Sequence, residues 1–330
     1  MERNLGKTSI TASRVGLGGI PIQRIDKEEA KKLVSYLLDN GLNFIDTARG
    51  YTCSEEFLGY ALENKKGFFI ATKSMARTYE GMMEDIEKSL KNLKVQAIDL
   101  YQVHNLKTFE EYEVVKKGAY KALLEAKEAG IIKHIGVTSH SYEFLDKIMA
   151  DGLFETIQFP YNIVESKSKD LFKKAKSLGL GTICMKPLGG GAIDDASLAI
   201  KFLLNDPNVD IIIPGMATIE EAKVNLNVSS GDYTEEEIKK IDEIKKELDH
   251  NFCRRCGYCA PCSVGIDIQA CFLFEGYYKR YDLGSWAKER YASLKHKANE
   301  CIKCGACMKR CPYEIDIISR LKEVSEIFDK

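Results

Sequence analysis

The 330-residue sequence lacks a long apolar segment, an excess of charge of one sign and a glycine-rich dinucleotide-binding turn. No apolar run approaches the roughly twenty residues that a membrane-spanning helix needs, and no secretion-signal pattern opens the chain. A formal net charge of −1 gives no electrostatic reason to expect binding to nucleic acid or to an anionic membrane. We therefore expect a cytoplasmic protein with neither a nucleic-acid nor a membrane partner.

Cysteine is scarce outside two short runs near the C-terminus. Of the 11 cysteines, only Cys53, Cys184 and Cys271 lie outside those runs. A secreted disulfide framework would spread its cysteines along the chain, so this distribution argues against one. We interpret Cys53 as a small packing residue near a pocket, because the sequence shows no base beside it.

The two runs hold four cysteines each at short, regular spacings. They are Cys253, Cys256, Cys259 and Cys262, and then Cys301, Cys304, Cys307 and Cys311, the last followed by Pro312. The second spacing is typical of bacterial [4Fe–4S] ferredoxins, in which three thiolates hold one cluster and the fourth serves another. Structural zinc sites use two plus two cysteines, so two runs of four favour iron–sulfur clusters and single-electron chemistry.

A tight turn with three thiolates can wrap one part of a cubic cluster but cannot supply its fourth ligand. We therefore predict that the two runs exchange their fourth ligands and bind two [4Fe–4S] clusters. Cys271 remains an alternative member of either set. The predicted sets are Cys253, Cys256 and Cys259 with Cys311, and Cys301, Cys304 and Cys307 with Cys262.

Up to about Asp249, short apolar runs alternate with amphipathic segments such as Lys27–Asn40, Glu80–Leu93 and Ser168–Leu178. This alternation predicts parallel strands connected by helices, and eight runs in this length match a (β/α)8 TIM barrel. The main alternative is a doubly wound sheet, which would want a G-x-G-x-x-G turn that Leu17-Gly-Gly-Ile lacks. The predicted strands are Val15–Gly18, Phe44–Ala48, Phe69–Lys73, Ile98–His104, Ile135–Ser139, Thr156–Phe159, Gly181–Pro187 and Asp210–Pro214.

The segments on either side of this alternating region complete the predicted organisation. A small hairpin around Leu5-Gly-Lys-Thr-Ser-Ile-Thr precedes the first barrel strand, and Thr234–Leu248 forms a last helix. Thr234 is its expected N-cap, and Glu237 completes a capping box. We place a barrel domain at residues 1–249 and a small, mainly helical ferredoxin-like iron–sulfur domain at residues 250–330.

Four reactive side chains stand at or just beyond the ends of three consecutive predicted strands. They are Asp46, Tyr51, Lys73 and His104. A (β/α)8 barrel gathers the carboxyl ends of its strands at one face, where its active site lies. Each residue alone is more often structural, but four of them at adjacent strand ends indicate an acid–base site.

These residues and their neighbours resemble the aldo-keto reductase superfamily over nearly all of residues 1–249. The resemblance includes the opening Leu-Gly-Lys-Thr, the Phe-Ile-Asp-Thr-Ala and Tyr-x-x-Ser-Glu segments and the strand ends at Lys73 and His104. It extends through Gly136-Val-Thr-Ser-His, Gln158 with Tyr161-Asn162, and Ile213-Pro-Gly with Asn225. With its cysteine-rich tail, the whole chain resembles the ferredoxin-fused branch of that superfamily.

The resemblance implies hydride transfer between a nicotinamide cofactor and a small carbonyl or alcohol substrate, with Tyr51 as the proton donor. A free phenol, with a pKa near 10, is a poor acid–base group at neutral pH. An ammonium at Lys73 would favour the phenolate, and Asp46 would hold that ammonium in place. His104 could then donate a hydrogen bond to the carbonyl oxygen, where charge develops.

By the same resemblance, the cofactor contacts lie on the later strands and loops. Thr138, Ser139 and Gln158 match positions that hold the nicotinamide carboxamide. Met185 stands where relatives often place an aromatic residue, so a flexible thioether would replace the stacking ring. The glycines that begin at Gly189 permit close approach to a pyrophosphate. The full set is Thr138, Ser139, Gln158, Met185, Pro187, Leu188, Gly189, Gly215, Glu221 and Asn225.

The sequence departs from NADPH-preferring relatives after the eighth strand. Those relatives place Lys and Arg where this chain has Gly215 and Glu221. A carboxylate would repel a 2′-phosphate and could accept a hydrogen bond from a 2′-hydroxyl, so we predict NAD(H) over NADP(H).

Three interpretations of the two modules remain open. In the first, the clusters exchange electrons with a ferredoxin or a flavoprotein. In the second, the clusters only stabilise a short domain attached to a carbonyl reductase. In the third, the barrel is a nicotinamide-binding redox sensor with little turnover.

Overall fold

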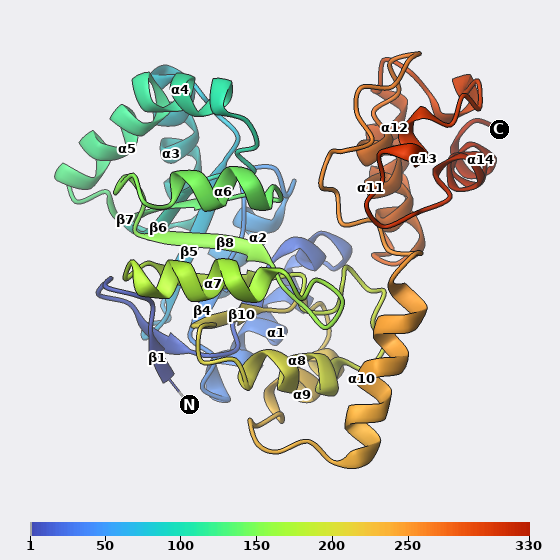
Figure 1. The fold of residues 1–330 in the computed structure, drawn as a ribbon. Helices are drawn as coiled ribbons and strands as arrows, with labels where there is room; N and C mark the ends of the chain where they lie inside the picture. The colour runs from blue at the N-terminus through green and yellow to red at the C-terminus, as the bar shows by residue number, and fades with distance from the viewer. Residues whose placement is uncertain (1) are drawn as a thin grey trace. The chain divides into compact units, whose positions relative to one another are not determined.

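The computed structural model describes residues 2–330, which form two compact units (Figure 1). The first unit runs to Leu188 and resumes over Asp195–Asp232. The second unit consists of Gly189–Asp194 together with Tyr233–Lys330. The domain boundary after Asp249 stays a prediction.

Eight parallel strands form the sheet of the first unit, and each pairs with the strand that follows it along the chain. This order is typical of a (β/α)8 barrel. The strands are β3 (Leu17–Gly18), β4 (Phe44–Asp46), β5 (Phe69–Ser74), β6 (Ile98–Val103), β7 (Ile132–Thr138), β8 (Thr156–Pro160), β9 (Gly181–Met185) and β10 (Ile211–Ile213).

The first and last segments of this sheet meet and bring the barrel close to full closure. Val15 forms a parallel bridge with Ile212, and Gly18 forms one with Gly215. The amide of Gly18 donates to the carbonyl of Pro214 at 2.8 Å. A Cβ at Gly18 would lie 2.8 Å from the carbonyl oxygen of Ile213, so glycine permits this approach. The predicted barrel is confirmed, and the doubly wound alternative, whose sheet edges stay apart, is wrong.

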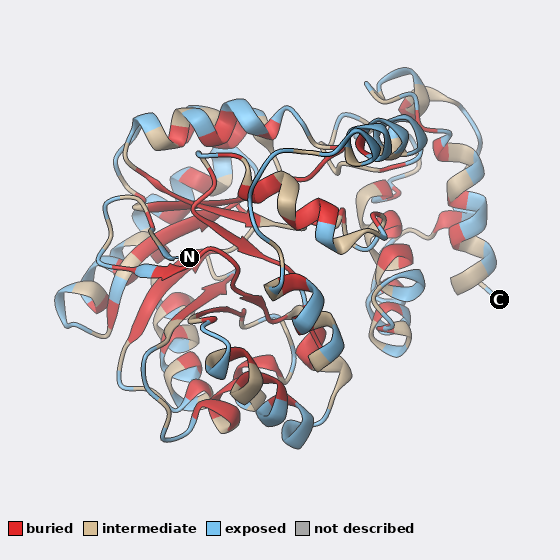
Figure 2. Ribbon diagram, turned by 90° about the horizontal axis from the view of Figure 1, so that it is seen from below, coloured by how far each residue is buried: buried red, intermediate tan, exposed pale blue. Residues whose placement is uncertain are grey.

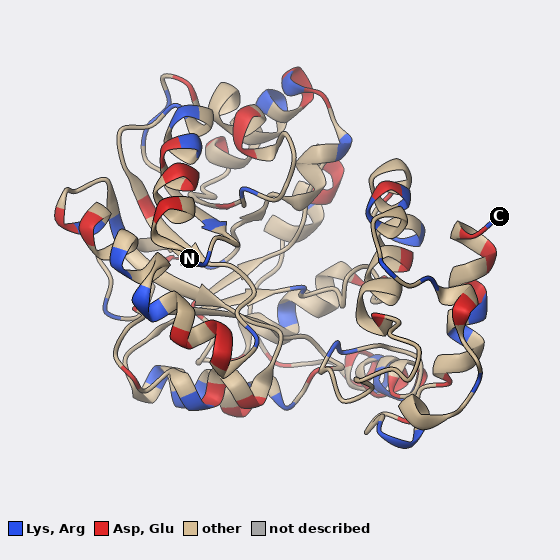
Figure 3. Ribbon diagram, turned by 90° about the horizontal axis from the view of Figure 1, so that it is seen from above, with Lys and Arg blue, Asp and Glu red and all other residues tan. Residues whose placement is uncertain are grey.

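Helices surround the strands, and buried residues gather on the strands and on the helix faces that meet them (Figure 2). Charged residues are spread over the outer helices, as expected for solvated faces (Figure 3). Asp26 begins the first α-helix with a capping box that includes Glu29. The helices are η1 (Ile20–Arg24), α1 (Lys27–Asp39), α2 (Ser54–Leu62), α3 (Tyr79–Leu93), α4 (Phe109–Lys117), α5 (Ala119–Glu128), α6 (Tyr142–Ile148), α7 (Ser168–Ser177), α8 (Ala196–Leu204) and α9 (Ile219–Leu226).

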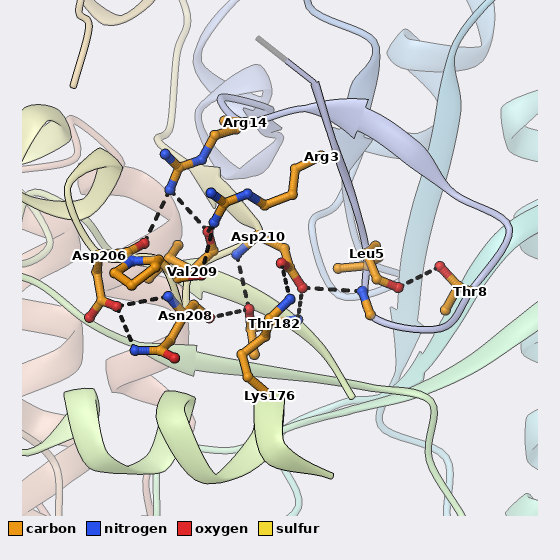
Figure 4. A network of polar contacts seen from close by, with 12 residues as sticks. Arg3, Leu5, Thr8, Arg14, Lys176, Thr182, Asp206, Asn208, Val209 and Asp210 are labelled. Carbon is orange, nitrogen blue, oxygen red and sulfur yellow. Dashed lines mark hydrogen bonds and ion pairs between the residues drawn. The ribbon is translucent and has the colours of Figure 1, made fainter. Parts of the chain in front are cut away.

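An antiparallel hairpin, β1 (Glu2–Asn4) and β2 (Thr11–Ser13), contacts residues that precede the barrel strands: Arg3 donates to the carbonyl of Val209, and the amide of Ser13 donates to the side chain of Asn43. Asp210, fully buried just before β10, accepts from Lys176 at 2.6 Å and from the amides of Gly6 and Thr182 (Figure 4). The buried guanidinium of Arg14 donates to the carbonyls of Leu204 and Val209. These contacts fix the amino end of the barrel and leave the carboxyl end for chemistry.

The second unit is mainly helical, as predicted. Its core packs around Phe272, Leu321 and Val324, and the Tyr291 ring stacks on Phe328 with centroids 4.5 Å apart. Its helices are α10 (Glu235–Leu248), α11 (Ile268–Lys279), α12 (Gly284–Ala292), η2 (Ala298–Glu300), α13 (Ala306–Lys309) and α14 (Ile317–Phe328). The predicted capping box at the start of α10 is present. Across residues 2–330, no helix is both long and apolar enough to cross a bilayer.

Candidate active site and cluster-binding cysteines

The carboxyl ends of β4, β5 and β6 carry three of the predicted catalytic residues to one end of the barrel. Asp46 is the last residue of β4, Lys73 is the next-to-last residue of β5, and His104 directly follows β6. Because these strands are parallel and adjacent, their ends lie side by side. The structure therefore brings together residues that are widely separated along the chain.

Asp46 and Lys73 form a buried ion pair. The ammonium of Lys73 lies 2.5 Å from one carboxylate oxygen of Asp46, and the two residues are 1% and 2% exposed. Lys73 also donates to the carbonyl of Thr47 at 2.8 Å, and Gln102 donates to the other Asp46 oxygen at 3.3 Å. Burial raises the pKa of Asp46 and lowers the pKa of Lys73, and the charge of each partner opposes the shift of the other.

Tyr51 lies in the loop between β4 and α2, with its ring near both Lys73 and His104. The Lys73 ammonium is 5.1 Å from the centroid of the Tyr51 ring. The His104 ring meets the Tyr51 ring edge-on, with centroids 6.1 Å apart and an angle of 85° between the planes. The phenol, the ammonium and the imidazole thus share one small region, as the sequence predicted.

A second ion pair, which sequence reasoning missed, fixes the Tyr51 loop. The Arg49 guanidinium forms an ion pair with the fully buried Glu55. The backbone amide of Arg49 also donates to the carbonyl of Lys73 at 3.0 Å. Thr72 and Ser89 also donate to Glu55. Glu55 stands in the Tyr-x-x-Ser-Glu segment, so its position was visible in the sequence, but its partners were not.

His104 carries a polar atom with no partner. Its Nδ1 is buried and makes no hydrogen bond within the described part of the chain. Burial, together with the charges of Lys73 and Arg77, pushes the pKa of His104 well below its ordinary value. The imidazole is therefore neutral near pH 7, and its unsatisfied nitrogen marks a place where a ligand or a water molecule would bind.

Several of the predicted cofactor contacts surround the same barrel end. Thr138 ends β7, Gln158 lies in β8 and Met185 ends β9. Within residues 2–330, the side-chain carbonyl oxygen of Gln158 is buried and has no hydrogen-bond partner, and the same holds for that of Asn225 on α9. Unpartnered buried acceptors fit a ligand that brings N–H donors, such as the carboxamide of a nicotinamide or the amino group of an adenine.

The other predicted cofactor contacts have partners of their own. Ser139 donates to the carbonyl of Leu106 at 2.6 Å. Gly189 opens three consecutive glycines with φ of 59°, 69° and 77°, and this loop belongs to the second unit. There Arg280 donates to the carbonyl of Gly190 at 3.0 Å. Pro187 and Leu188 link the loop to the barrel, and Gly215 bridges to Gly18.

Glu221 makes hydrogen bonds and an ion pair that its position in the sequence did not indicate. Its side chain accepts from the amides of Ala217 and Thr218, which completes a capping box at the start of α9. Its other oxygen lies 3.5 Å from the guanidinium of Arg24, a cation that sequence reasoning missed. The acidic residue at this position therefore has a basic neighbour.

Each cysteine run borders a hollow that also receives one cysteine from the other run. One hollow is lined by Cys253, Cys256, Cys259 and Cys311, and the other by Cys301, Cys304, Cys307 and Cys262. This grouping coincides with the two sets predicted from spacing, while the ligation itself stays a prediction.

The arrangement of these thiols fits clusters better than single metal ions. Within residues 2–330, no three or more His, Cys, Asp or Glu side chains converge as the ligands of one ion do. A cubic cluster is ligated at four separate irons, so its cysteines surround a space and do not meet at a point. Cys271 is fully buried in α11 and lines neither hollow.

Family models assign both regions of the chain. A model described as the Aldo/keto reductase family matches residues 14–198 and 194–246, and a 4Fe-4S dicluster domain model matches residues 252–316. The chain belongs to the aldo/keto reductase family. It is therefore an oxidoreductase with an iron–sulfur domain, as the sequence predicted, and the nicotinamide dependence of that family fits the buried acceptors.

Named relatives of this aldo/keto reductase share the barrel region. The chain is 32% identical to aldo-keto reductase YhdN of Bacillus subtilis over 57% of this chain and 63% of that protein. It is 26% identical to L-galactose dehydrogenase of Arabidopsis thaliana over 68% of this chain and 86% of that protein. The structure of aldo-keto reductase AKR11C1 from Bacillus halodurans in its holo form superimposes with a TM-score of 0.63 and 22% sequence identity. The match covers 74% of this chain and 95% of that one, which shows the shared fold.

The cysteine grouping gives a first prediction. Cys311→Ser should lose one of two clusters and about half of the iron and sulfide, because it removes the fourth ligand of the first run. Cys271→Ser is the matched control and should keep all of its iron, since this side chain lines neither hollow. The measurement is a chemical count of iron and sulfide after anaerobic reconstitution. Iron loss in Cys271→Ser, with full loading of Cys311→Ser, would overturn the assignment.

Proposed function

We propose that this aldo/keto reductase reduces a small carbonyl compound, with Tyr51 as the proton donor, and that its iron–sulfur module exchanges single electrons with an external carrier. The observation that carries the first part is the position of the Tyr51 ring, which lies 5.1 Å from the Lys73 ammonium and edge-on to a neutral His104. A bound nicotinamide would supply the hydride.

The residues of the chain itself handle the proton and the developing charge. As hydride reaches the carbonyl carbon, negative charge grows on the oxygen, and Tyr51 donates its proton there to give the alcohol. The Lys73 ammonium stabilises the phenolate that remains, and Asp46 holds Lys73 in position. Neutral His104 offers one N–H to the same oxygen and orients the substrate.

The buried acceptors on Gln158 and Asn225 support a nicotinamide dinucleotide as the cofactor. Met185 at the end of β9 would pack against the nicotinamide ring, and Pro187 and Leu188 would approach the pyrophosphate. Thr138 and Ser139 would complete the carboxamide site. We propose NAD(H) as the preferred form, because Glu221 forms an ion pair with the nearby Arg24 and its carboxylate would repel a 2′-phosphate.

The cysteine hollows support an electron-transfer role for the second unit. Ile268 borders both hollows, so two clusters would be separated by little more than one side chain. Cys304 is exposed, which would bring one cluster to the surface. A ferredoxin or a flavoprotein is the partner we propose for that surface. A cell compartment that keeps these thiols reduced, the cytoplasm, suits this chemistry.

Replacing Tyr51 tests the carbonyl reduction. Tyr51→Phe should lower kcat/KM for a small aldehyde by about 10³-fold or more, because it removes the donated proton and keeps the ring. The dissociation constant for NADH should stay within about twofold. Tyr60→Phe, which makes the same chemical change where the hydroxyl contacts Glu28, serves as the control. Aldehyde turnover that survives in Tyr51→Phe would exclude Tyr51 as the proton donor. A wild-type enzyme that binds NADH but turns over no aldehyde would favour the interpretation of the barrel as a nicotinamide-binding redox sensor.

The cofactor preference has its own test, by fluorescence titration with NADH and NADPH. NADH should bind the wild-type protein more tightly. Glu221→Gln should narrow this difference in affinity about tenfold, because it removes the carboxylate that would repel a 2′-phosphate, while the amide oxygen can still cap α9. A lower dissociation constant for NADPH in the wild-type protein would refute the preference.

A further inference from the structure

The carboxyl end of the barrel holds a second lysine besides Lys73, and this second lysine forms no ion pair with an acidic residue of the described chain. Lys186 directly follows β9, and its ammonium lies 2.8 Å from Nε2 of His140. Over residues 2–330, no carboxylate lies within ion-pair distance of this ammonium. Lys73, in contrast, is neutralised by Asp46. Lys186 is only half-buried, so its remaining N–H groups can reach a ligand.

The hydrogen bonds on both sides of His140 fix its protonation state. A lysine ammonium can only donate, so Nε2 of His140 must accept. Nδ1 then carries the proton and donates to the side-chain oxygen of Asn105 at 3.0 Å. The imidazole is therefore neutral in this arrangement, and it orients Lys186 without cancelling its positive charge.

This chain of contacts directs Lys186 toward the catalytic side of the barrel end. Asn105 is the residue after His104, and the backbone amide of Asn105 donates to the Thr138 hydroxyl at 2.7 Å. Arg77 donates to the carbonyl of His104 at 2.9 Å and fixes the same turn. The ammonium that follows β9 thus contacts His140 just beyond β7, and His140 in turn contacts Asn105, the residue after His104.

Two residues of this chain of contacts have backbones that glycine would adopt more easily. Lys186 has φ of 58° and Asn105 has φ of 52°. A left-handed conformation is uncommon in a lysine and costs free energy, and such outliers gather at functional sites. The conformation turns the chain at the end of β9, at the residue whose side chain meets His140.

We propose that Lys186, held by His140, binds an oxyanion on the substrate, so that the preferred substrate is an aldehyde or ketone bearing a carboxylate or a phosphate. This inference rests on the proposed carbonyl reduction and names its substrate class. An ammonium with free N–H donors at a partly desolvated site attracts such a group by charge and by hydrogen bonding. The distance between the oxyanion and the carbonyl would then be set by the span from Lys186 to Tyr51.

Paired substrates test the proposal and separate the two sources of the oxyanion. Succinic semialdehyde is compared with butanal, and glyceraldehyde 3-phosphate with glyceraldehyde. In Lys186→Ala, KM should rise at least tenfold for the charged member of one pair and stay within about twofold for its neutral counterpart. Lys186→Arg should keep most of the preference, because it keeps the positive charge. Lys107→Ala, which removes an exposed lysine near the end of β6, controls for net charge.

Two outcomes would overturn the proposal. One is an equal change in KM for charged and neutral substrates in Lys186→Ala. The other is weaker NADH binding with no change in substrate preference, which would assign the lysine to the dinucleotide. Calorimetric titration with succinate and with phosphate, without turnover, keeps this test separate from the proposed reaction. Anion binding that depends on Lys186 in an enzyme inactive toward every aldehyde would refute carbonyl reduction and leave the anion site standing.

Discussion

Closure of the parallel sheet is the constraint on which the chemistry of the barrel depends. The bridges from Val15 to Ile212 and from Gly18 to Gly215 bring the first strand beside the last. All eight strands then point their carboxyl ends toward one end of the barrel. Residues separated by dozens of positions, such as Asp46, Lys73 and His104, become neighbours there because of strand order alone. The hairpin and the Asp210 network fix the opposite end.

The polar groups at this end would be costly if they served only the fold. A buried ion pair is seldom the most stable way to fill a core, since both charges lose their hydration. The unpartnered nitrogen of His104 and the unpartnered oxygens of Gln158 and Asn225 add further cost, about 1 to 3 kcal/mol for each unsatisfied group. His104 and Gln158 lie beside this ion pair, and a polar ligand that supplies their missing partners best explains these unsatisfied groups.

The sequence predicted the elements of this fold better than their side-chain partners. Apolar runs located all eight barrel strands, and cysteine spacing anticipated which thiols share a hollow. Five strands end one or two residues before their apolar runs. At β6 and β9, Asn105 and Lys186 adopt left-handed backbones that break the extended chain. Side-chain pairs such as Arg49 with Glu55 and Arg24 with Glu221 join residues that only the folded barrel brings together, so no local pattern announces them. The helix-capping role of Glu221 is an exception, since Thr218-x-x-Glu is a local signal.

The second unit raises a different question, because a nicotinamide passes two electrons as hydride while each cluster takes one. Our central claim is that the chain carries both kinds of redox chemistry, and that the clusters are more than supports for a short domain. An anaerobic redox titration of the reconstituted protein, followed by electron paramagnetic resonance, tests this claim most directly. The account predicts that both clusters take up and release one electron each between about −700 and +450 mV without losing iron, with signals broadened by their proximity across Ile268. Clusters that cannot be reduced reversibly anywhere in that range would contradict it.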